Sequence, residues 1–255
     1  MDEQIIDLKG KKAIVTGGSR GIGRATALLL AQAGADVGIA YRARDEEAAA
    51  TVTELNRWGR RAWAVAADLG EAGGAGRLFK LCDEEFGWLD IFVANAGIWP
   101  PEYVPLVEMS DEQWREMIET NLTSVFWTVR EAARRMADGG KIIIVSSTAG
   151  QRGEAGHSHY AATKGGIISF VKSLAVELAA RDIQVNAVAP GWVDTDMAAP
   201  ALEGEERQKV IAQIPLGRIG TADDVAGPIL FLCSNLARHV TGEILNVNGG
   251  SVLCG

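Results

Sequence analysis

Short apolar segments alternate with longer amphipathic segments along the whole chain of 255 residues. The short segments, such as Lys12 to Thr16, have the length of buried strands, and the longer ones repeat apolar residues at helical spacing. Parallel strands must be joined by crossover connections, usually helices, so this order predicts a parallel sheet with helices on both faces. We therefore expect a doubly wound α/β fold.

Seven strands are expected, at residues 12–16, 36–41, 61–67, 89–95, 141–146, 183–188 and 243–247. Helices are expected at residues 21–33, 45–58, 71–86, 111–136, 158–180 and 221–234. No linker or internal repeat interrupts this order, so residues 1–255 are predicted to form a single domain. Residues 196–215, which include Pro200 and Pro215, break the rhythm, and we expect a helical insertion there that covers the substrate as a lid.

Composition excludes several other classes of protein. The 30 glycines follow no G-X-Y period, and a hydrophobic content of 47% argues against disorder. A net charge of −8 argues against general nucleic-acid binding, and no apolar run approaches the roughly 20 residues that span a bilayer. The acidic first residues do not form a signal segment, and three scattered cysteines have neither disulfide nor zinc spacing. We expect a cytoplasmic protein without a metal site.

A glycine-rich segment, Thr16-Gly17-Gly18-Ser19-Arg20-Gly21-Ile22-Gly23, directly follows the first expected strand. In open α/β sheets, ligands bind beyond the carboxyl ends of the strands. Glycines there let the backbone approach a pyrophosphate, and the N-terminus of the next helix adds free N–H groups and a partial positive charge. A purely structural turn is the alternative, but the position favours a dinucleotide.

The end of the second expected strand indicates which dinucleotide binds. NAD sites place an acidic residue about 20 positions after the glycines, where it holds the ribose 2′-hydroxyl. This chain has Arg42 there, and the first carboxylate is Asp45. Arg42, together with Arg20 of the glycine-rich segment, can form charge-assisted hydrogen bonds with a 2′-phosphate. An exposed arginine is often only solvated, but two at these positions predict NADP(H).

Tyr160 and Lys164 lie four positions apart on an expected helix, so their side chains share one face. Ser147 follows the fifth expected strand, at the same edge of the sheet as the glycines. Tyrosine has a pKa of about 10, but a nearby ammonium group favours its ionised form. A serine hydroxyl can stabilise a carbonyl oxygen that gains negative charge. The pattern indicates acid–base chemistry, and a structural role of the Tyr/Lys pair stays an open alternative.

Further motifs complete a resemblance to a known family. They are Asp68-Leu69, Asn95-Ala96-Gly97, Asn121, and Pro190-Gly191 followed by Thr195. Together with the glycine-rich segment, Ser147 and the Tyr160-Xaa3-Lys164 pair, they resemble the motifs of the short-chain dehydrogenase/reductases over essentially the whole chain. The resemblance implies a single-domain Rossmann fold with a seven-stranded parallel sheet.

The resemblance also implies hydride transfer from NADPH to a ketone carbon, with Asn121, Ser147, Tyr160 and Lys164 as catalytic residues. Tyr160 would protonate the ketone oxygen, Ser147 would position it, and Lys164 would hold the nicotinamide ribose and lower the pKa of Tyr160. Asn121 would support a water that links Lys164 to solvent. Cofactor contacts are expected from Gly17, Ser19, Arg20, Gly21, Ile22, Gly23, Arg42, Asp68, Leu69, Asn95, Ala96, Gly97, Tyr160, Lys164, Pro190, Gly191, Val193 and Thr195.

The family is typically tetrameric or dimeric, so the resemblance implies a homotetramer, without nucleic-acid or membrane partners. A protein that binds NADP(H) as a sensor or scaffold, without catalysis, is the alternative from another class. The intact catalytic positions favour an enzyme.

Within the family, the chain is most similar to 3-oxoacyl-(acyl-carrier-protein) reductases and to sugar, polyol or cyclic-alcohol dehydrogenases. Reductases that act on an acyl carrier protein tend to present basic residues near the mouth of the active site. Arg181 fits this pattern, but Asp138 stands where a second basic residue is expected, with Arg134 and Arg135 one turn away.

The substrate pocket is expected to include Trp99, Glu154, His157, Trp192 and Met197. Trp99 and Trp192 follow the fourth and sixth expected strands, where aromatic side chains would favour an apolar or ring-shaped substrate over a small sugar. Core packing is an equal alternative for both tryptophans, and a structural role is the alternative for His157.

Overall fold

The computed structural model describes residues 5–254 and contains one seven-stranded sheet. Its strands run in the spatial order β3-β2-β1-β4-β5-β6-β7, and every neighbouring pair is parallel. The strands are β1 (Lys12–Thr16), β2 (Asp36–Tyr41), β3 (Ala62–Ala66), β4 (Leu89–Ala94), β5 (Met136–Val145), β6 (Gln184–Pro190) and β7 (Ile244–Val247). The order reverses between β1 and β4, which opens a crevice at the carboxyl ends of these strands.

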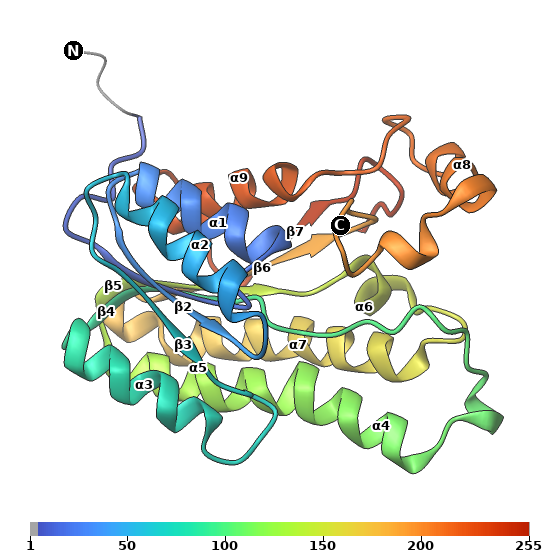
Figure 1. Ribbon diagram of the computed structural model, residues 1–255, viewed down its shortest axis with the longest axis horizontal. Coiled ribbons are helices and arrows are strands. Elements are labelled where there is room, and N and C mark those ends of the chain that lie inside the picture. The colour runs from blue at the N-terminus through green and yellow to red at the C-terminus, as the bar shows by residue number, and fades with distance from the viewer. Residues whose placement is uncertain (1–4, 255) are drawn as a thin grey trace.

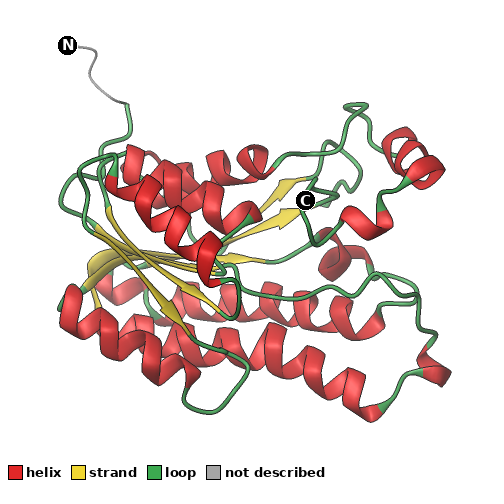
Figure 2. Ribbon diagram, in the orientation of Figure 1, coloured by secondary structure: helices red, strands yellow, loops and turns green. Residues whose placement is uncertain are grey.

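Helices cover both faces of the sheet (Figure 1). They are α1 (Gly21–Gln32), α2 (Asp45–Asn56), α3 (Gly74–Glu85), α4 (Asp111–Ile118), α5 (Ser124–Arg135), α6 (Thr148–Arg152), α7 (Ser158–Glu177), α8 (Gly204–Ala212) and α9 (Ala222–Cys233). Figure 2 shows α1, α2 and α9 on one side of the strands and α3, α4, α5 and α7 on the other. The doubly wound α/β fold predicted from the sequence is therefore confirmed.

Strand β5 shows why its sequence is apolar on both faces. Ile142 and Ile144 enter the core beneath α3, α5 and α7, where Phe79 and Phe92 are also buried. Ile143 points the opposite way, into the core formed with α1 and α9. Because side chains alternate along a strand, a central strand between two helical layers must be apolar at every position.

The predicted helix at residues 111–136 is confirmed, with two differences in detail. The helix is continuous but contains a π-helical turn at Glu119–Thr123, and it ends at Arg135. Met136 instead has extended backbone and begins β5, five residues before the predicted start of that strand. Its side chain packs where a Cβ at Gly140 would stand, so the missing side chain of that glycine accommodates the methionine.

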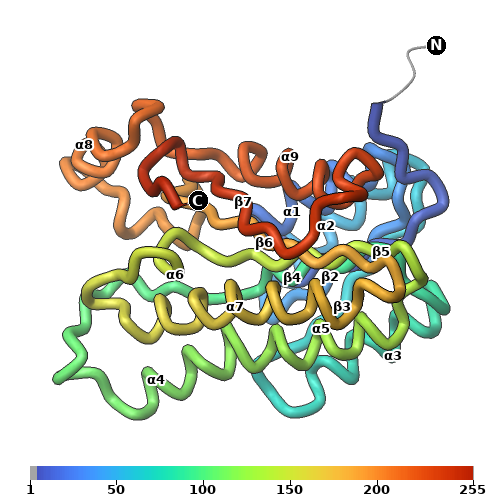
Figure 3. The backbone as a smooth tube through the Cα atoms, turned by 180° about the vertical axis from the view of Figure 1, so that it is seen from behind, coloured from blue at the N-terminus to red at the C-terminus, as the bar shows by residue number. Residues whose placement is uncertain are grey.

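The other predicted boundaries differ by a few residues. Helix α3 begins at Gly74, after Gly73 with φ of +98°, and not at residue 71. The short helix α6 was not predicted, because five residues are too few to show a helical period. Residues 196–215 do form a helical insertion, with a 3₁₀ turn at Ala199–Ala201 and α8. Figures 1 and 3 show α8 at the same end of the molecule as α6.

Two of the three cysteines, Cys82 and Cys233, are buried thiols, and Cys254 is exposed. Burial raises the pKa of the Cys82 thiol to about 11 and that of Cys233 to about 12, so both are protonated near neutral pH. Within residues 5–254, no cluster of three His, Cys, Asp or Glu side chains could hold a metal ion. In the same part of the chain, no helix is long and apolar enough to cross a membrane.

Candidate active site

The glycine-rich segment connects β1 to α1 and lies in the crevice between β1 and β4. Gly17 and Gly21 have φ values of +66° and +53°, which a residue with a side chain rarely adopts. A Cβ at Gly17 would lie 2.9 Å from Nδ2 of Asn95, and a Cβ at Gly23 would collide with the main-chain oxygen of Gly17. The glycines thus keep the loop tight against the start of α1, where free N–H groups face the crevice.

Asn95 and Thr16 join this loop to the end of β4. The carboxamide Nδ2 of Asn95 donates to the main-chain oxygens of Thr16, at 2.9 Å, and Gly17, at 3.3 Å. In return, Oγ1 of Thr16 accepts hydrogen bonds of 3.0 Å from the main-chain N–H groups of Asn95 and Ala96. These four bonds hold the two loops that form the crevice at a fixed distance from each other.

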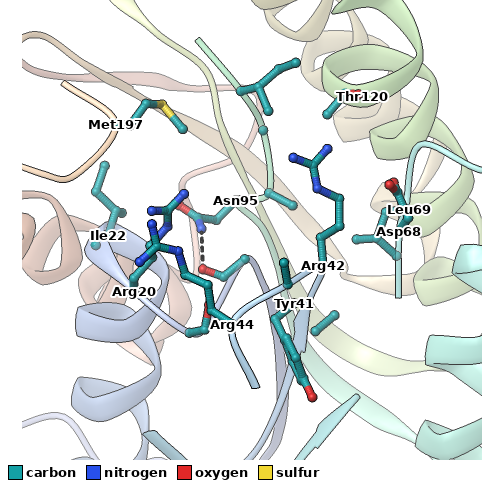
Figure 4. A pocket seen from close by; sticks show the side chains of 18 of the residues that line it. Arg20, Ile22, Tyr41, Arg42, Arg44, Asp68, Leu69, Asn95, Thr120 and Met197 are labelled. Atoms are coloured by element: carbon teal, nitrogen blue, oxygen red, sulfur yellow. Dashed lines mark hydrogen bonds between the residues drawn. The ribbon is translucent and has the colours of Figure 1, made fainter. Parts of the chain in front are cut away.

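A groove of about 240 Å³ runs along the carboxyl ends of β1, β2, β3 and β4 (Figure 4). Twelve residues predicted to contact a cofactor line it: Gly17, Ser19, Arg20, Gly21, Ile22, Arg42, Asp68, Leu69, Asn95, Ala96, Gly97 and Thr195. A third arginine, Arg44, also lines it, and Figure 4 shows its guanidinium group beside that of Arg20. Sequence reasoning assigned no role to Arg44.

The region that follows β2 offers cations and no free carboxylate to this groove. Tyr41 is the last residue of β2, and its hydroxyl donates a 2.8 Å hydrogen bond to Asp45, the first residue of α2. In the part of the chain that the structure describes, the guanidinium group of Arg42 has no hydrogen-bond or ion-pair partner. This end of the groove suits a phosphate better than a ribose hydroxyl.

A second cavity of about 160 Å³ continues from the groove, and the two share Ile22, Asn95, Gly97, Ile98, Thr195 and Met197 in their walls. Ser147, Tyr160 and Lys164 line this second cavity, together with the predicted cofactor residues Pro190, Gly191 and Val193. We call it the catalytic cavity. Of the predicted cofactor residues, only Gly23 lines neither space, because it packs beneath the loop.

Ser147 and Tyr160 meet in the catalytic cavity. Ser147 is the N-cap of α6, and its Oγ accepts a 3.1 Å hydrogen bond from the main-chain N–H of Ala149. Burial raises the pKa of Tyr160 to about 12; a hydrogen bond with Ser147 opposes this rise, and the charge of Glu154 adds to it. The phenol is therefore protonated near neutral pH, as a proton donor must be.

Lys164 is 5% exposed and lies below Tyr160, with Nζ 5.7 Å from the centre of the phenol ring. Its Nζ donates a 2.8 Å hydrogen bond to the main-chain oxygen of Val145, the last residue of β5. Burial lowers the pKa of Lys164 to about 8, so its ammonium group is more acidic than that of an ordinary lysine but is still mostly charged at pH 7.

Asn121 is fully buried in the π-helical turn, beside the predicted catalytic residues. Its Oδ1 accepts from the main-chain N–H of Ile98, and its Nδ2 donates to the main-chain oxygen of the same residue, both at 2.8 Å. A Cβ at the neighbouring Gly97 would lie 3.1 Å from Oδ1 of Asn121 and 3.7 Å from Nζ of Lys164. The side chain of Asn121 therefore fixes the segment that passes over Lys164.

Four of the five predicted substrate-pocket residues line the catalytic cavity: Trp99, Glu154, Trp192 and Met197. The two tryptophan rings meet edge to face, with centroids 5.5 Å apart. His157 does not line the cavity; its buried ring stacks on Trp99 at a centroid distance of 4.9 Å, which fits the structural role given above as the alternative. His157 thus supports the wall of the cavity without forming part of its surface.

Outside the cavity, Arg181 is engaged by its neighbours. Its Nε lies 3.0 Å from Oδ1 of Asp138, and its guanidinium group also donates to the main-chain oxygens of Ala133 and Met136. Asp138, which stands where a second basic residue is expected, therefore neutralises Arg181.

These features define a class of protein: a dinucleotide-binding α/β fold whose groove leads to a half-buried serine and tyrosine and a buried lysine. Residues 17–251 match the family model described as enoyl-(acyl carrier protein) reductase. The 3-oxoacyl-(acyl-carrier-protein) reductase FabG of Aquifex aeolicus (strain VF5) is 43% identical over 248 residues, 96% of this chain and 98% of that protein. The chain belongs to the short-chain dehydrogenase/reductase family.

Solved structures support the same assignment. A short-chain dehydrogenase from Burkholderia cenocepacia J2315 in complex with NADP has a TM-score of 0.90 and 37% identity, covering 96% of this chain and 98% of that one. The promiscuous reductase LugOII, which catalyses keto-reduction at C1 during lugdunomycin biosynthesis, has a TM-score of 0.90 and 36% identity, covering 96% and 99%.

Proposed function

We propose that this protein is an oxidoreductase that uses NADP(H) to reduce a ketone to a secondary alcohol. The observation that carries the proposal is the continuity of the two spaces: the groove lined by Arg20 and Arg42 opens into the cavity lined by Tyr160. The cofactor is NADP(H), since the groove offers arginines and no free carboxylate after β2, and the structural relative from Burkholderia cenocepacia binds NADP. When bound, this cofactor supplies the hydride.

The residues of the chain then perform the proton chemistry. Ser147 donates a hydrogen bond to the ketone oxygen and holds it beside Tyr160. Tyr160 transfers its phenolic proton to that oxygen as negative charge develops there. The Lys164 ammonium group favours the phenolate that remains, and Asn121 holds the main chain of Ile98, whose neighbour Gly97 lies near Lys164.

The Tyr160→Phe variant tests this mechanism. We expect the variant to bind NADPH like the wild type but to lose ketone-dependent loss of NADPH absorbance, because phenylalanine keeps the ring and removes the transferable proton. Normal turnover by the variant would show that Tyr160 is not the proton donor. Loss of NADPH binding would instead point to a role in holding the cofactor.

The Arg42→Asp variant tests the cofactor assignment. A carboxylate at this position repels a 2′-phosphate and can accept a hydrogen bond from a ribose 2′-hydroxyl, so we expect the preference to shift from NADPH toward NADH. Lys209→Asp, on the surface of α8 and outside both spaces, is a control for the change of charge. An unchanged ratio of kcat/KM for the two cofactors would remove Arg42 from phosphate recognition.

For the substrate, the first candidate is a 3-oxoacyl thioester, as the names of the FabG relatives suggest. The Arg181–Asp138 ion pair argues that docking of an acyl carrier protein is weak. A comparison of acetoacetyl thioesters on acyl carrier protein and on N-acetylcysteamine tests both points. We expect activity on the small thioester, and Asp138→Arg should lower KM only for the carrier-bound form, because it frees Arg181 and adds a second cation.

The second candidate is a cyclic or aromatic ketone, and the observation that favours it is the corner formed by Trp99 and Trp192. Aromatic walls bind flat apolar rings through stacking and edge contacts. Trp192→Ala should then raise KM for cyclic ketones much more than for acetoacetyl thioesters. Equal effects on both substrate classes would favour the thioester.

We also propose that residues 196–215 close over the catalytic cavity as a lid, and that the protein is a cytoplasmic homotetramer. Met197 and Ala198 already line the cavity. Exposed aromatic side chains on α4 and α5, Trp114 and Phe126, suit an interface between copies of the chain. Mass measurement by light scattering tests the oligomeric state, and Phe126→Glu should yield smaller assemblies.

A further inference from the structure

In the cofactor groove, the first residue of the helical insertion, Asp196, forms ion pairs with Arg20 of the glycine-rich segment and with Arg44, which follows β2. Asp196 follows β6, and its Oδ2 lies 3.1 Å from Nη1 of Arg20 and 3.8 Å from Nη1 of Arg44. Both arginines and Asp196 line the groove. One carboxylate oxygen thus pairs with two guanidinium groups that come from different loops.

Arg20 and Arg44 are placed for this convergence by their backbone. Arg20 is the N-cap residue of α1, but a guanidinium group has no acceptor with which to cap the helix, and the residue lines the groove instead. Arg44 is the N-cap of α2 with φ of +76°, a left-handed conformation that is unfavourable for arginine. Strained residues of this kind concentrate at sites that bind ligands. Nη1 of Arg44 also lies 3.0 Å from Oε1 of Glu47.

We propose that Asp196 occupies the subsite in which Arg20 and Arg44 receive the 2′-phosphate of the cofactor, and so determines how strongly the protein prefers phosphorylated cofactor. The proposal rests on the assignment of NADP(H) above and adds Asp196 and Arg44 to the residues that set specificity. Before the cofactor binds, the carboxylate satisfies the two arginines in place of a phosphate.

The chemistry of the two anions makes them competitors. A carboxylate carries one negative charge, whereas a phosphate monoester carries close to two and offers three acceptor oxygens. The side chains of Arg20, Arg44 and Asp196 are 44%, 47% and 61% exposed, so their ion pairs are weak and a phosphate can displace the carboxylate. A carboxylate that stayed in place would repel the incoming phosphate.

Displacement of Asp196 also affects the wall of the catalytic cavity. Its neighbours Thr195 and Met197 line both the cofactor groove and the catalytic cavity. Release of Asp196 from the arginines therefore frees the start of the helical insertion when a phosphorylated cofactor arrives. An unphosphorylated cofactor leaves the ion pair intact.

The test compares the full-length protein with its Asp196→Asn variant in calorimetric binding of adenosine 2′,5′-bisphosphate and adenosine 5′-monophosphate. Asparagine keeps the shape of the side chain and removes its charge. We expect the Kd of the bisphosphate to fall by about three- to tenfold, as for removal of one exposed competing charge, and the Kd of the monophosphate to stay constant.

Asp194→Asn is the matched control. Asp194 lies two residues away on the same segment and pairs at 2.6 Å with Arg207 of α8, not with the groove. We expect this variant to bind both ligands like the wild type. Arg44→Met provides a second measurement: it should weaken binding of the bisphosphate and reduce the gain that Asp196→Asn gives.

Three results would overturn the proposal: unchanged bisphosphate binding in Asp196→Asn, weaker binding in that variant, or an equal gain for both ligands. Failure of the cofactor assignment looks different. In that case the wild type itself binds the bisphosphate no better than the monophosphate, before any variant is considered.

Discussion

Nζ of Lys164 donates a hydrogen bond of 2.8 Å to the main-chain oxygen of Val145, and this bond joins the helix of the proton donor to the end of β5, two residues before Ser147. The bond partly compensates a buried charge. The lowered pKa of Lys164 means that the folded protein disfavours its protonated form relative to the unfolded chain, in which the pKa is near 10.5.

We predict that Lys164→Met stabilises the protein while it abolishes ketone reduction. The lowering from 10.5 to about 8 corresponds to about 3 kcal/mol at pH 7, and loss of the bond to Val145 returns about 1 kcal/mol of this. We therefore expect a net gain of about 2 kcal/mol in the free energy of unfolding, measured by urea denaturation without cofactor.

The pH dependence of this gain identifies its cause. Below about pH 8 the folded wild type carries the full penalty, and above about pH 10.5 the lysine is neutral in both the folded and unfolded states. The wild type should therefore gain stability between these values, and the advantage of Lys164→Met should shrink. A constant advantage at every pH would attribute the effect to packing.

The rate of catalysis should also depend on the ionisation of Lys164. Tyr160 keeps its proton up to about pH 12, but the ammonium group of Lys164 is lost as the pH rises through about 8. We expect the rate of ketone reduction to fall above pH 8 with a single ionisation. Stopped-flow measurement of NADPH oxidation between pH 6 and 10 checks this prediction; a rate that stays constant to pH 10 would contradict it.

Gly23→Ala should damage the glycine-rich loop. The added Cβ collides with the main-chain oxygen of Gly17, so the loop and α1 must separate, at a cost of about 1–3 kcal/mol. We expect a lower Tm and weaker binding of NADPH. Gly76→Ala in α3 is the control, because open space surrounds that position and alanine favours the helix by about 0.4–1 kcal/mol. Equal effects of the two substitutions would show that the close approach at Gly23 is unimportant.

Asn121→Ala should remove both hydrogen bonds to Ile98 and leave its part-buried main-chain groups without these partners, at a cost of about 1–3 kcal/mol. Because Ile98 lies in the walls of both cavities, we expect kcat to fall along with Tm. Asn56→Ala, on the exposed end of α2, is the comparison and should change neither. A variant with lower Tm but unchanged kcat would limit Asn121 to a structural role.

The alternation of apolar and amphipathic segments predicts the layers and the seven strands, because burial imposes those periods on the sequence directly. The first and last residues of the helices and strands are harder to predict from the sequence. The start of β5 at Met136 depends on space left by Gly140, and this packing has no periodic signal.

The same distinction applies to the site. The structure gathers Ser147, Tyr160 and Lys164 in one cavity, which agrees with the position of Ser147 after a strand and with the four-residue spacing of Tyr160 and Lys164 on one helix face. Arg44 and Asp196 were missed because their meeting depends on an unusual backbone conformation and on two loops distant in sequence. The only available signal was the second arginine in the segment after β2. The sequence leaves open whether His157 lines the cavity or supports its wall, because sequence order does not show that its ring stacks on Trp99.

The contacts around Lys164 also bear on how the protein reaches its folded state. Oγ of Ser146 donates to the main-chain oxygen of Lys164 at 2.9 Å, and Gly150 packs against the same turn of α7 without room for a Cβ. These contacts, like the bond from Lys164 to Val145, join residues fewer than 20 positions apart. Their loop-closure entropy is small, whereas the cofactor groove joins loops that are far apart in sequence, such as those of Arg20 and Asp196, which are 176 positions apart. The catalytic centre is therefore expected to form early during folding, before the groove that will supply its hydride.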